Sequence, residues 1–493
     1  MTQRAIVSVL NAFVAFVWFS VLDICPAIGH AQAAAAKVLP CDECVSIRVG
    51  IPHIGRGPGA DIADNRFTEI ELPDGRYRGF DAHASTLAID GNQPWDMSGP
   101  GQVVLKPGPP GSNDSCGQWI QHVEPVGNKL LGFVHDESDC KYQVGQTHKS
   151  MSLAISTDYG LTWKDKGQIL TGTDQPTPNK NTGLGDCTAF NGEDGYLYAY
   201  CGRPSDGGVV VARAPVATPG PGYWYKFFQG KWDQPGLAGD ATSLGRGLGT
   251  SAARWTTSGE TLLLGWVKGG LGLFFSTDHT TLKPLRVPLL PVDPGVWRRP
   301  APTELIFYPV LLDAKTGGTQ LSNSWMLTYA YCQPNEACDR KYLVFRNVNV
   351  SVSTTAQQAQ VGVMLARWYN GALHDRWSTT TAVPGSYRTY KLEGEFGYLL
   401  TAADAAEPSV EVEDCVSQRP GHPDHLLAEK GFCEAHDYQR LRTAGWVYEK
   451  PQTGRKPLYR CYNSQEQSHF ASNAPDCENL GGMEKLIGYD LNN

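Results

Sequence analysis

Ser-Thr-Asp-Tyr-Gly-Leu-Thr-Trp, residues 156–163, has the features of a tightly specified turn between two strands. The Asp158 carboxylate can accept hydrogen bonds from the backbone of its own turn, and Gly160 can take a conformation that a Cβ disfavours. Trp163 supplies a ring that can pack beneath the turn. An alternating pattern at residues 151–155 precedes the turn and residues 167–170 follow it, so we expect a β-hairpin.

This octapeptide resembles the Asp-box, Ser-x-Asp-x-Gly-x-Thr-Trp, which caps β-hairpins in sialidases and related β-propellers, and every defining position matches. The resemblance implies a hairpin between outer strands of a propeller blade, with Asp158 as a folding residue and not a catalytic one. Ser276-Thr-Asp278 follows another strand pattern and is similar to a degenerate second box at the matching place in its blade.

The composition is that of an ordinary globular protein long enough for two or three hydrophobic cores. Of 493 residues, 41% are hydrophobic and 19% charged, and the 54 glycines and 33 prolines suit many short strands joined by turns. A net charge of −8 argues against nucleic acid or an anionic membrane as the main partner.

Residues 45–355 form five successive groups of short strand patterns, each with about the content of one propeller blade. The first group covers 67–72 and 77–80. The others cover 119–123, 130–134 and 151–155; 196–200, 209–212 and 223–228; 250–255, 262–266 and 271–275; and 304–308, 325–330 and 342–345. Residues 45–49 are expected to close the ring by pairing with the last group.

Residues 360–493 contain a threefold repeat. Its units start at 365–370, 412–417 and 458–463, and we take Trp377, His425 and His469 as equivalent positions. A Gly-aromatic pair follows each of these positions after 20, 20 and 19 residues. One unit is too small to bury its own apolar face, so the three are expected to pack as one module.

Together with Asp81, the His122-x-Glu124 pattern and the His135-Asp-Glu137 pattern, residues 45–355 look like the five-bladed propeller of furanosidase-type glycoside hydrolases. Residues 360–493 are similar to a repeat module found C-terminal to secreted bacterial hydrolases. We therefore predict an all-β chain, with a five-bladed β-propeller followed by a small three-repeat, mainly β C-terminal domain. A sialidase is disfavoured because no arginine triad or tyrosine nucleophile can be assigned. The strand groups also predict five blades and not six.

The N-terminus has the pattern of a secretory signal peptide over residues 1–33. Arg4 precedes an apolar run at 5–21, and Ala31-Gln-Ala33 offers a small-residue cleavage site. An N-terminal membrane anchor is the alternative, but Asn11, Ser20 and Asp23 interrupt the run. We expect export to the medium or the periplasm, with no membrane attachment after cleavage.

The cysteines indicate an oxidising compartment. Removing Cys25 leaves twelve of the thirteen, and most fall into close pairs. The predicted disulfides are Cys116–Cys140, Cys187–Cys201, Cys332–Cys338, Cys415–Cys433 and Cys461–Cys477, with Cys41–Cys44 left open. The repeat predicts the last two independently, since Cys433 and Cys477 each lie 8 residues after the repeat histidine.

Glycoside hydrolysis needs two carboxyl groups on either side of the sugar, one acting as acid and one as base or nucleophile. In a propeller these come from different blades and face the central funnel. The catalytic candidates are Asp81, Glu124, Glu137 and Asp186, and the candidate substrate-binding residues are Asp64, His122 and His135.

Each candidate also has a purely structural interpretation. Asp81, expected to have room beside it for a ligand, and Asp64 could both be turn aspartates, and Asp186 could cap the start of its blade. His122 and Glu124 share one face of an apolar strand, where burial costs energy unless the pair is functional. His135 and Glu137 could form a second pair beside the first, or an exposed strand end.

The leading hypothesis is an exported glycoside hydrolase that cuts a poly- or oligosaccharide, with arabinan-like furanosides as the favoured class. The alternative is a non-catalytic carbohydrate-binding or cell-surface interaction propeller. No cofactor and no metal are expected, because a third clear metal ligand and an HExxH helix are missing. The expected partner is a glycan, not nucleic acid or membrane, and the chain is expected to be a monomer.

Overall fold

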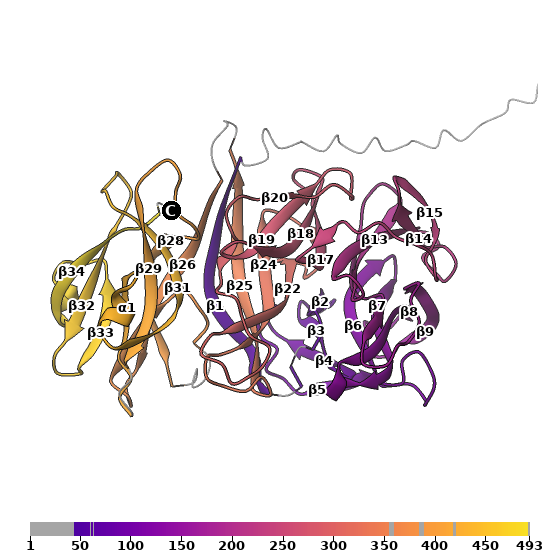
Figure 1. Cartoon of the computed structure of the whole chain (residues 1–493), viewed down its shortest axis with the longest axis horizontal. Helices are drawn as coiled ribbons and strands as arrows, with labels where there is room; N and C mark the ends of the chain where they lie inside the picture. The colour runs from indigo at the N-terminus through magenta and orange to yellow at the C-terminus, as the bar shows by residue number, and fades with distance from the viewer. Residues whose placement is uncertain are drawn as a thin grey trace, which may run out of the picture. The chain divides into compact units, whose positions relative to one another are not determined.

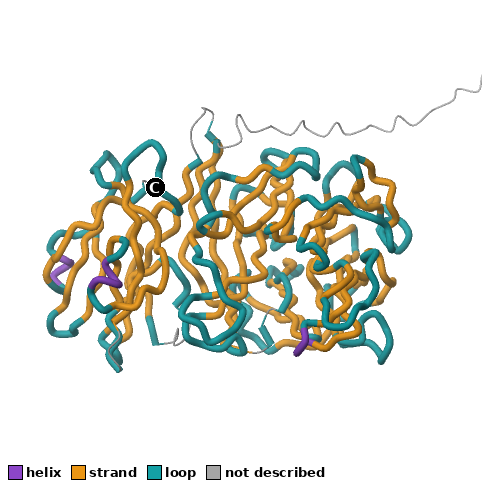
Figure 2. The backbone as a smooth tube through the Cα atoms, in the orientation of Figure 1, coloured by secondary structure: helices purple, strands orange, loops and turns teal. Residues whose placement is uncertain are grey.

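The computed structural model describes residues 44–59, 61–62, 64–353, 359–383, 389–417 and 421–491. The chain divides into two units, Met1–Ala36 and Lys37–Asn493, and the first lies outside the described residues. The predicted signal peptide, Cys25 and Cys41 therefore also lie outside them. Strands dominate the described part (Figure 2), and its helical turns are short: η1 (Tyr142–Val144), α1 (Phe432–Ala435) and η2 (Cys477–Asn479).

Four separate sheets follow one another along the chain, and we number them blades 1 to 4. Blade 1 has β2 (Thr68–Glu71), β3 (Tyr77–His83), β4 (Ser85–Gly91) and β5 (Gly101–Leu105). Blade 2 has β6 (Gly117–Val126), β7 (Lys129–Lys141), β8 (Gln146–Ser156), β9 (Lys164–Thr171) and β10 (Asn181–Gly183). Blade 3 has β11 (Gly185–Asn191), β12 (Tyr196–Arg203), β13 (Gly208–Pro215), β14 (Tyr225–Phe228), β15 (Lys231–Pro235) and β16 (Gly245–Arg246). Blade 4 has β17 (Leu248–Trp255), β18 (Glu260–Val267), β19 (Gly270–Ser276), β20 (Lys283–Pro284), β21 (Leu290–Pro291) and β23 (Gln320–Leu321).

Blade 5 closes the ring with strands from both ends of the propeller sequence. It consists of β22 (Leu305–Asp313), β24 (Ser324–Cys332), β25 (Lys341–Val352) and β1 (Val45–Gly59). β1 runs antiparallel to β25, with Val45 opposite Val352 and Val49 opposite Val348. The predicted closure by residues 45–49 is confirmed, and the predicted five-bladed propeller with it.

The first strand of each blade lies next to the central axis. β6 contacts β2 and β11, and β17 contacts β11 and β22, so the first strands follow one another around the ring. Residues 119–123 of β6 are all buried, because a strand near the axis has neighbouring blades on both faces. Polar side chains at the ends of these strands are therefore brought towards the two mouths of the funnel.

The turn at residues 156–163 joins β8 to β9, the outer part of blade 2. The Asp158 carboxylate accepts hydrogen bonds from the Thr162 backbone N–H at 2.9 Å and the Thr162 hydroxyl at 2.6 Å. Trp163 packs edge-on against Phe80 of blade 1 at 5.7 Å between ring centroids. Asp158 thus has a folding role, tying its own turn together and placing a ring between two blades.

The C-terminal domain has three units with the same strand pairing. Unit 1 has β26 (Gln360–Asn370), β27 (Asp375–Thr379) and β28 (Lys391–Leu400); unit 2 has β29 (Ser409–Ser417), β30 (His425–Glu429) and β31 (Tyr438–Tyr448); unit 3 has β32 (Pro457–Asn463), β33 (Ser468–Ser472) and β34 (Gly482–Tyr489). In each unit the first strand pairs with both others, and the middle strands of the three units contact one another.

The register corrects one detail of the repeat. Arg376 lies opposite Tyr369, His425 opposite Val416, and His469 opposite Tyr462, so Arg376 is the equivalent of the two histidines. The predicted equivalent, Trp377, is one residue further along and stacks on His425 at 4.1 Å. All five disulfides predicted within the described residues are present.

A continuous sheet joins the propeller to the C-terminal domain. The free edge of β1 pairs in parallel with β26, with Ser46 opposite Gln360 and Val49 opposite Val363, which makes a sheet of 13 strands. Figure 1 shows the indigo β1 beside the orange strands of this domain. A buried ion pair at 2.9 Å between Arg442 of β31 and Glu304, just before β22, reinforces the junction.

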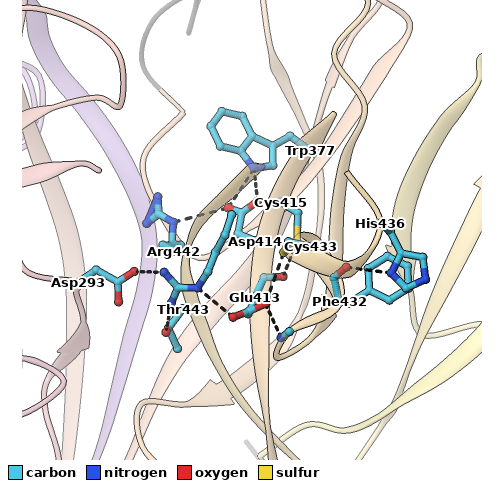
Figure 3. Close-up of a disulfide and its surroundings, with 12 residues drawn as sticks. Asp293, Trp377, Glu413, Asp414, Cys415, Phe432, Cys433, His436, Arg442 and Thr443 are labelled. Atoms are coloured by element: carbon cyan, nitrogen blue, oxygen red, sulfur yellow. Dashed lines mark hydrogen bonds and ion pairs between the residues drawn. A yellow bond between two sulfur atoms is a disulfide. The ribbon is translucent and has the colours of Figure 1, made fainter. Parts of the chain in front are cut away.

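The disulfide Cys415–Cys433 lies close to this junction (Figure 3). Arg442 also approaches Asp414, the neighbour of Cys415, at 3.5 Å, and Asp414 accepts a hydrogen bond from the Trp377 indole at 3.0 Å. The first two repeat units and the propeller therefore share one buried polar network.

Candidate functional site

The two predicted His/Glu pairs lie at opposite mouths of the funnel. In the antiparallel pairing of β6 with β7, Glu137 is opposite Gly117, whereas Glu124 is opposite Leu131. At about 3.3 Å per residue, the seven residues from Gly117 to Glu124 separate the two glutamates by roughly 23 Å along the strands. The expectation that the pairs lie side by side is wrong, because the register of a hairpin is not visible in the spacing.

Two hydrogen-bond donors hold Glu137 at one mouth. His135 Nε2 lies 3.2 Å from one carboxylate oxygen, and the Tyr142 hydroxyl donates to the other at 2.7 Å. The backbone N–H of Asp186 donates to His135 Nδ1 at 3.0 Å, so the imidazole carries its proton on Nε2, facing Glu137. Glu137 is buried, and its interpretation as an exposed strand end is wrong.

Asp186 begins blade 3 and reaches the same place. Lys149 of β8 bridges the two carboxylates, with Nζ 2.8 Å from Asp186 and 3.6 Å from Glu137. Asp186 has φ of +53°, an uncommon conformation for a residue with a side chain. Its carbonyl accepts hydrogen bonds from the Arg66 guanidinium and the Thr250 hydroxyl, which hold this conformation.

Both carboxylates are ionised in this environment. Burial alone would raise the pKa of Asp186, but Lys149, His135 and Arg66 outweigh it and hold that pKa well below its usual value. For Glu137, burial is likewise outweighed by His135 and Lys149, so its pKa is also lowered. The two carboxylates in turn raise the pKa of Lys149 in spite of its burial.

Asp64 adds a third carboxylate, from the segment that precedes blade 1. It lies 3.6 Å from His83 Nδ1 and 4.0 Å from Lys341 Nζ, and its side chain is 42% exposed. Burial raises its pKa, but the hydrogen bond to His83 and the charge of Lys341 lower it below the usual value. Asp64 is therefore the most accessible of the three carboxylates.

Tyr308 of β22 lies among these three carboxylates. It is half-buried, and its pKa is raised well above the usual value by burial and by the charges of Asp186, Asp64 and Glu137. Its φ is +51°, which makes it the second strained residue at this mouth. The ring also lies under the Arg66 guanidinium, 5.6 Å from the ring centroid. We call Asp64, Glu137, Lys149, Asp186 and Tyr308 the carboxylate cluster.

Asp81 is near this mouth but is enclosed. It lies on β3 with no exposed surface, and one carboxylate oxygen accepts the Ala82 N–H at 2.9 Å. The Ala82 carbonyl accepts the Asp64 N–H at 2.9 Å, so Asp81 lies behind the segment that carries Asp64. The space for a ligand that we expected beside Asp81 is therefore not present.

The other mouth holds Glu124, His122 and a further buried acid. His122 Nε2 lies 3.2 Å from the Glu124 carboxylate, which also accepts the Thr319 hydroxyl at 3.4 Å. Glu69 of β2 lines the same cavity of about 650 Å³, and burial raises its pKa well above the usual value. Among the described residues that line this cavity, no lysine bridges two carboxylates as Lys149 does at the other mouth.

Two members of the cluster, Lys149 and Tyr308, and the neighbouring Arg66 were not predicted from the sequence. They come from blade 2, blade 5 and the segment before blade 1, and only Arg66 is close in sequence to a predicted site residue. The positive φ angles of Asp186 and Tyr308 leave no signal in residue type. Within the described ranges, no group of three or more His, Cys, Asp or Glu side chains is arranged to hold a metal ion.

Comparisons with known proteins identify similar solved structures only. No family model matches the chain, and no curated protein matches it. A family 117 glycoside hydrolase of Zobellia galactanivorans is 9% identical, with a TM-score of 0.40, covering 64% of this chain and 94% of its own. A GH32 β-fructofuranosidase of Bombyx mori is 10% identical, with a TM-score of 0.39, and the match covers 86% of this chain and 88% of the β-fructofuranosidase. A protein of unknown function from Dyadobacter fermentans is 14% identical, with a TM-score of 0.35, and the match covers 57% of this chain and 75% of that protein.

None of the helices in the described part of the chain is long and apolar enough to span a membrane.

Proposed function

We propose that the chain is an exported glycoside hydrolase whose active site is the carboxylate cluster. The observation that carries the proposal is the Lys149 ammonium, which bridges Glu137 of blade 2 and Asp186 of blade 3. Asp64, from the segment before blade 1, lies close enough for the charge of Asp186 to act on it. Keeping three carboxylates and an ammonium in a partly buried site is costly unless the charges are used. The five disulfides support an oxidising compartment outside the cytoplasm.

The environment of each carboxylate suggests its role. Asp64 is ionised and the most accessible, which suits the base or nucleophile on the open side of the sugar. Asp186 is fixed by its 2.8 Å ion pair and suits stabilisation of the positive charge that develops on the sugar. Glu137 suits the proton donor, because a bound sugar that expels water would strengthen the burial that already favours its protonated form.

The substrate class remains that predicted from the sequence, a poly- or oligosaccharide with arabinan-like furanosides first. The test is release of reducing sugar from debranched arabinan, galactan and xylan by the purified secreted chain. Glu137→Gln and Asp64→Asn should each lower kcat by at least about 100-fold, and Glu434→Gln, an exposed acid of the C-terminal domain, serves as the matched control. Full activity in both cluster variants would reject this site.

One observation favours a second function, a non-catalytic glycan-binding propeller. All three carboxylates are shifted towards the ionised form, so the unliganded protein offers no protonated carboxyl at this mouth among the groups with a resolved pKa. A binding protein needs no proton donor, and ionised carboxylates accept hydrogen bonds from sugar hydroxyls. Binding of a glycan that is never cut, at any pH between 4 and 8, would favour this function over hydrolysis.

A further inference from the structure

A groove of about 600 Å³ lies beside the carboxylate cluster, between blades 4 and 5. The residues that matter for its chemistry are Arg66, Gly249, Gly265, Trp266, Trp297 and Tyr308, and we call it the Trp groove. Trp266 is the next-to-last residue of β18, whereas Trp297 lies on the connection between β21 and β22. Neither tryptophan was among the site residues predicted from the sequence.

Both tryptophans expose an unusual amount of apolar surface. Trp297 is 69% exposed and Trp266 is 44% exposed, whereas Trp224, Trp255 and Trp325 are almost completely buried. Exposed apolar area costs about 25 cal/mol per Å² relative to burial, so two large rings on one groove are unfavourable unless a ligand covers them. Two exposed indole rings on one concave surface are typical of a binding site.

A continuous row of side chains links the groove to the cluster. The Trp297 ring lies 5.2 Å from the Phe307 ring, and Phe307 lies 5.4 Å from Tyr308. The Arg66 guanidinium lies over the Tyr308 ring and donates a hydrogen bond of 2.9 Å to the Asp186 carbonyl. A ligand that occupies the carboxylate cluster would therefore have its next units against the two tryptophans.

The chemistry of the lining favours uncharged sugar rings. None of the described residues that line the groove is Asp, Glu, Lys or His, and the guanidinium of Arg66 already donates to the protein. The glycines leave the groove floor free of side chains. The apolar face of a sugar presents C–H groups of slight positive charge, which suit the negative face of an indole ring. An acidic polymer would find no free cation here.

We propose that the Trp groove binds the sugar units adjacent to the reacting one in a neutral polysaccharide, so that the substrate is a chain several sugars long. This inference rests on the proposed function, because it takes the carboxylate cluster as the place of cleavage. Trp297 is the principal platform and Trp266 the second. Arg66 and Tyr308 form the passage between the groove and the cluster.

The experiment compares substrate lengths. For Trp297→Ala and Trp266→Ala, KM is measured on debranched arabinan and on a short aryl arabinofuranoside that fills only the cluster. We expect KM for the polymer to rise about tenfold, the loss of ~1.4 kcal/mol, with little change for the short substrate. Tyr223→Ala removes a ring that is 53% exposed on blade 3 and is the matched control. Trp297→Phe should restore most of the polymer affinity, and the Tm of every variant is measured alongside.

The outcomes separate this inference from the proposed function. Hydrolysis by the wild type with an unchanged polymer KM in both tryptophan variants rejects the groove alone, and so does an equal loss on short and long substrates. If no polymer is cut, affinity electrophoresis in arabinan, galactan or xylan decides. If a polymer slows the migration of the wild type but not of Trp297→Ala, the groove binds glycan and the hydrolysis proposal is rejected. If no polymer slows the wild type, both the groove and the hydrolysis proposal are rejected. Retardation by polygalacturonate and by no neutral polymer also rejects the groove.

Discussion

The backbone N–H of Asp186 donates a hydrogen bond of 3.0 Å to Nδ1 of His135 and joins blade 3 to blade 2 at the mouth of the funnel. The bond determines which imidazole nitrogen carries the proton and so directs an N–H towards Glu137. It also places the side chains of Asp186 and Glu137 on either side of one ammonium group. The geometry of the candidate acid therefore depends on a backbone contact between blades.

His135→Phe should impair turnover more than binding. The variant loses the Nε2–H donor to Glu137, so the carboxylate is less well oriented and its pKa rises. We expect kcat to fall about 10–100-fold with a smaller change in KM, and the alkaline limb of the pH–rate profile, which reports the proton donor, to move to higher pH. His436→Phe, at an exposed histidine of the C-terminal domain, is the control. An unshifted profile with reduced kcat would mean that His135 acts only through the fold.

Gly185→Ala should disrupt the contact between His135 and blade 3. A Cβ at Gly185 would lie 2.5 Å from the His135 ring, so the imidazole must move away from Glu137. We expect a loss of activity similar to that of His135→Phe. Gly220→Ala adds a methyl group where no atom lies within 4 Å and should leave activity unchanged. Equal activity of the two alanine variants would contradict the role given to His135.

Lys149→Met should destabilise the protein at neutral pH more than at low pH. The substitution leaves Asp186 and Glu137 ionised without their shared cation, and loss of one partner of a buried pair costs about 3–5 kcal/mol. The folded pKa of Asp186 is depressed, so the pair's stabilisation is fully present above the unfolded value of about 3.9 and is lost progressively as pH falls from there through the lower folded pKa. Urea unfolding at pH 7 and pH 3.5 measures this.

The control for that experiment is Lys231→Met, which removes an exposed lysine of blade 3. The difference in unfolding free energy between wild type and Lys149→Met should shrink at the lower pH, while the control differs little at either. A difference that is the same at both pH values would show that Lys149 contributes by packing and not by charge.

Arg442→Met should weaken the junction between the propeller and the C-terminal domain. Glu304 and Arg442 are 1% and 4% exposed, so the variant leaves a buried carboxylate without its cation at a cost of about 3–5 kcal/mol. Because β1 pairs with strands of both the propeller and the C-terminal domain, we expect the two to unfold in a single transition, at a lower Tm in the variant. Arg246→Met, at an exposed arginine, is the control. Two separated transitions in the wild type would contradict the coupling.

The strand patterns and the cysteine spacing predicted most of the fold. Alternation and turn residues identified five groups of strands, and the alternating Val-Ser-Ile-Arg-Val pattern at residues 45–49 predicted the ring closure. Repeat spacing predicted two of the disulfides. It misplaced the repeat position in unit 1 by one residue, because the distance from that position to the Gly-aromatic pair varies between units: 21 residues from Arg376 to Gly397, against 20 from His425 to Gly445 and 19 from His469 to Gly488.

The site was predictable only in part. Glu137, Asp186, His135 and Asp64 were identified as polar residues at strand ends, and the structure brings them together. Glu124 and His122 looked equally suitable, and only the register of β6 with β7 shows that they belong to the other mouth. Lys149 and Tyr308 were missed because their role comes from contacts between blades, which a single sequence does not specify.

The most direct test of the central claim is the turnover of a neutral glycan by wild type and Glu137→Gln under identical conditions. The account predicts that wild type releases reducing sugar from at least one neutral polysaccharide, and that Glu137→Gln reduces kcat by at least about 100-fold with an unchanged Tm. Turnover that persists in Glu137→Gln but disappears in Glu124→Gln would contradict it, since the reaction would then belong to the opposite mouth of the funnel.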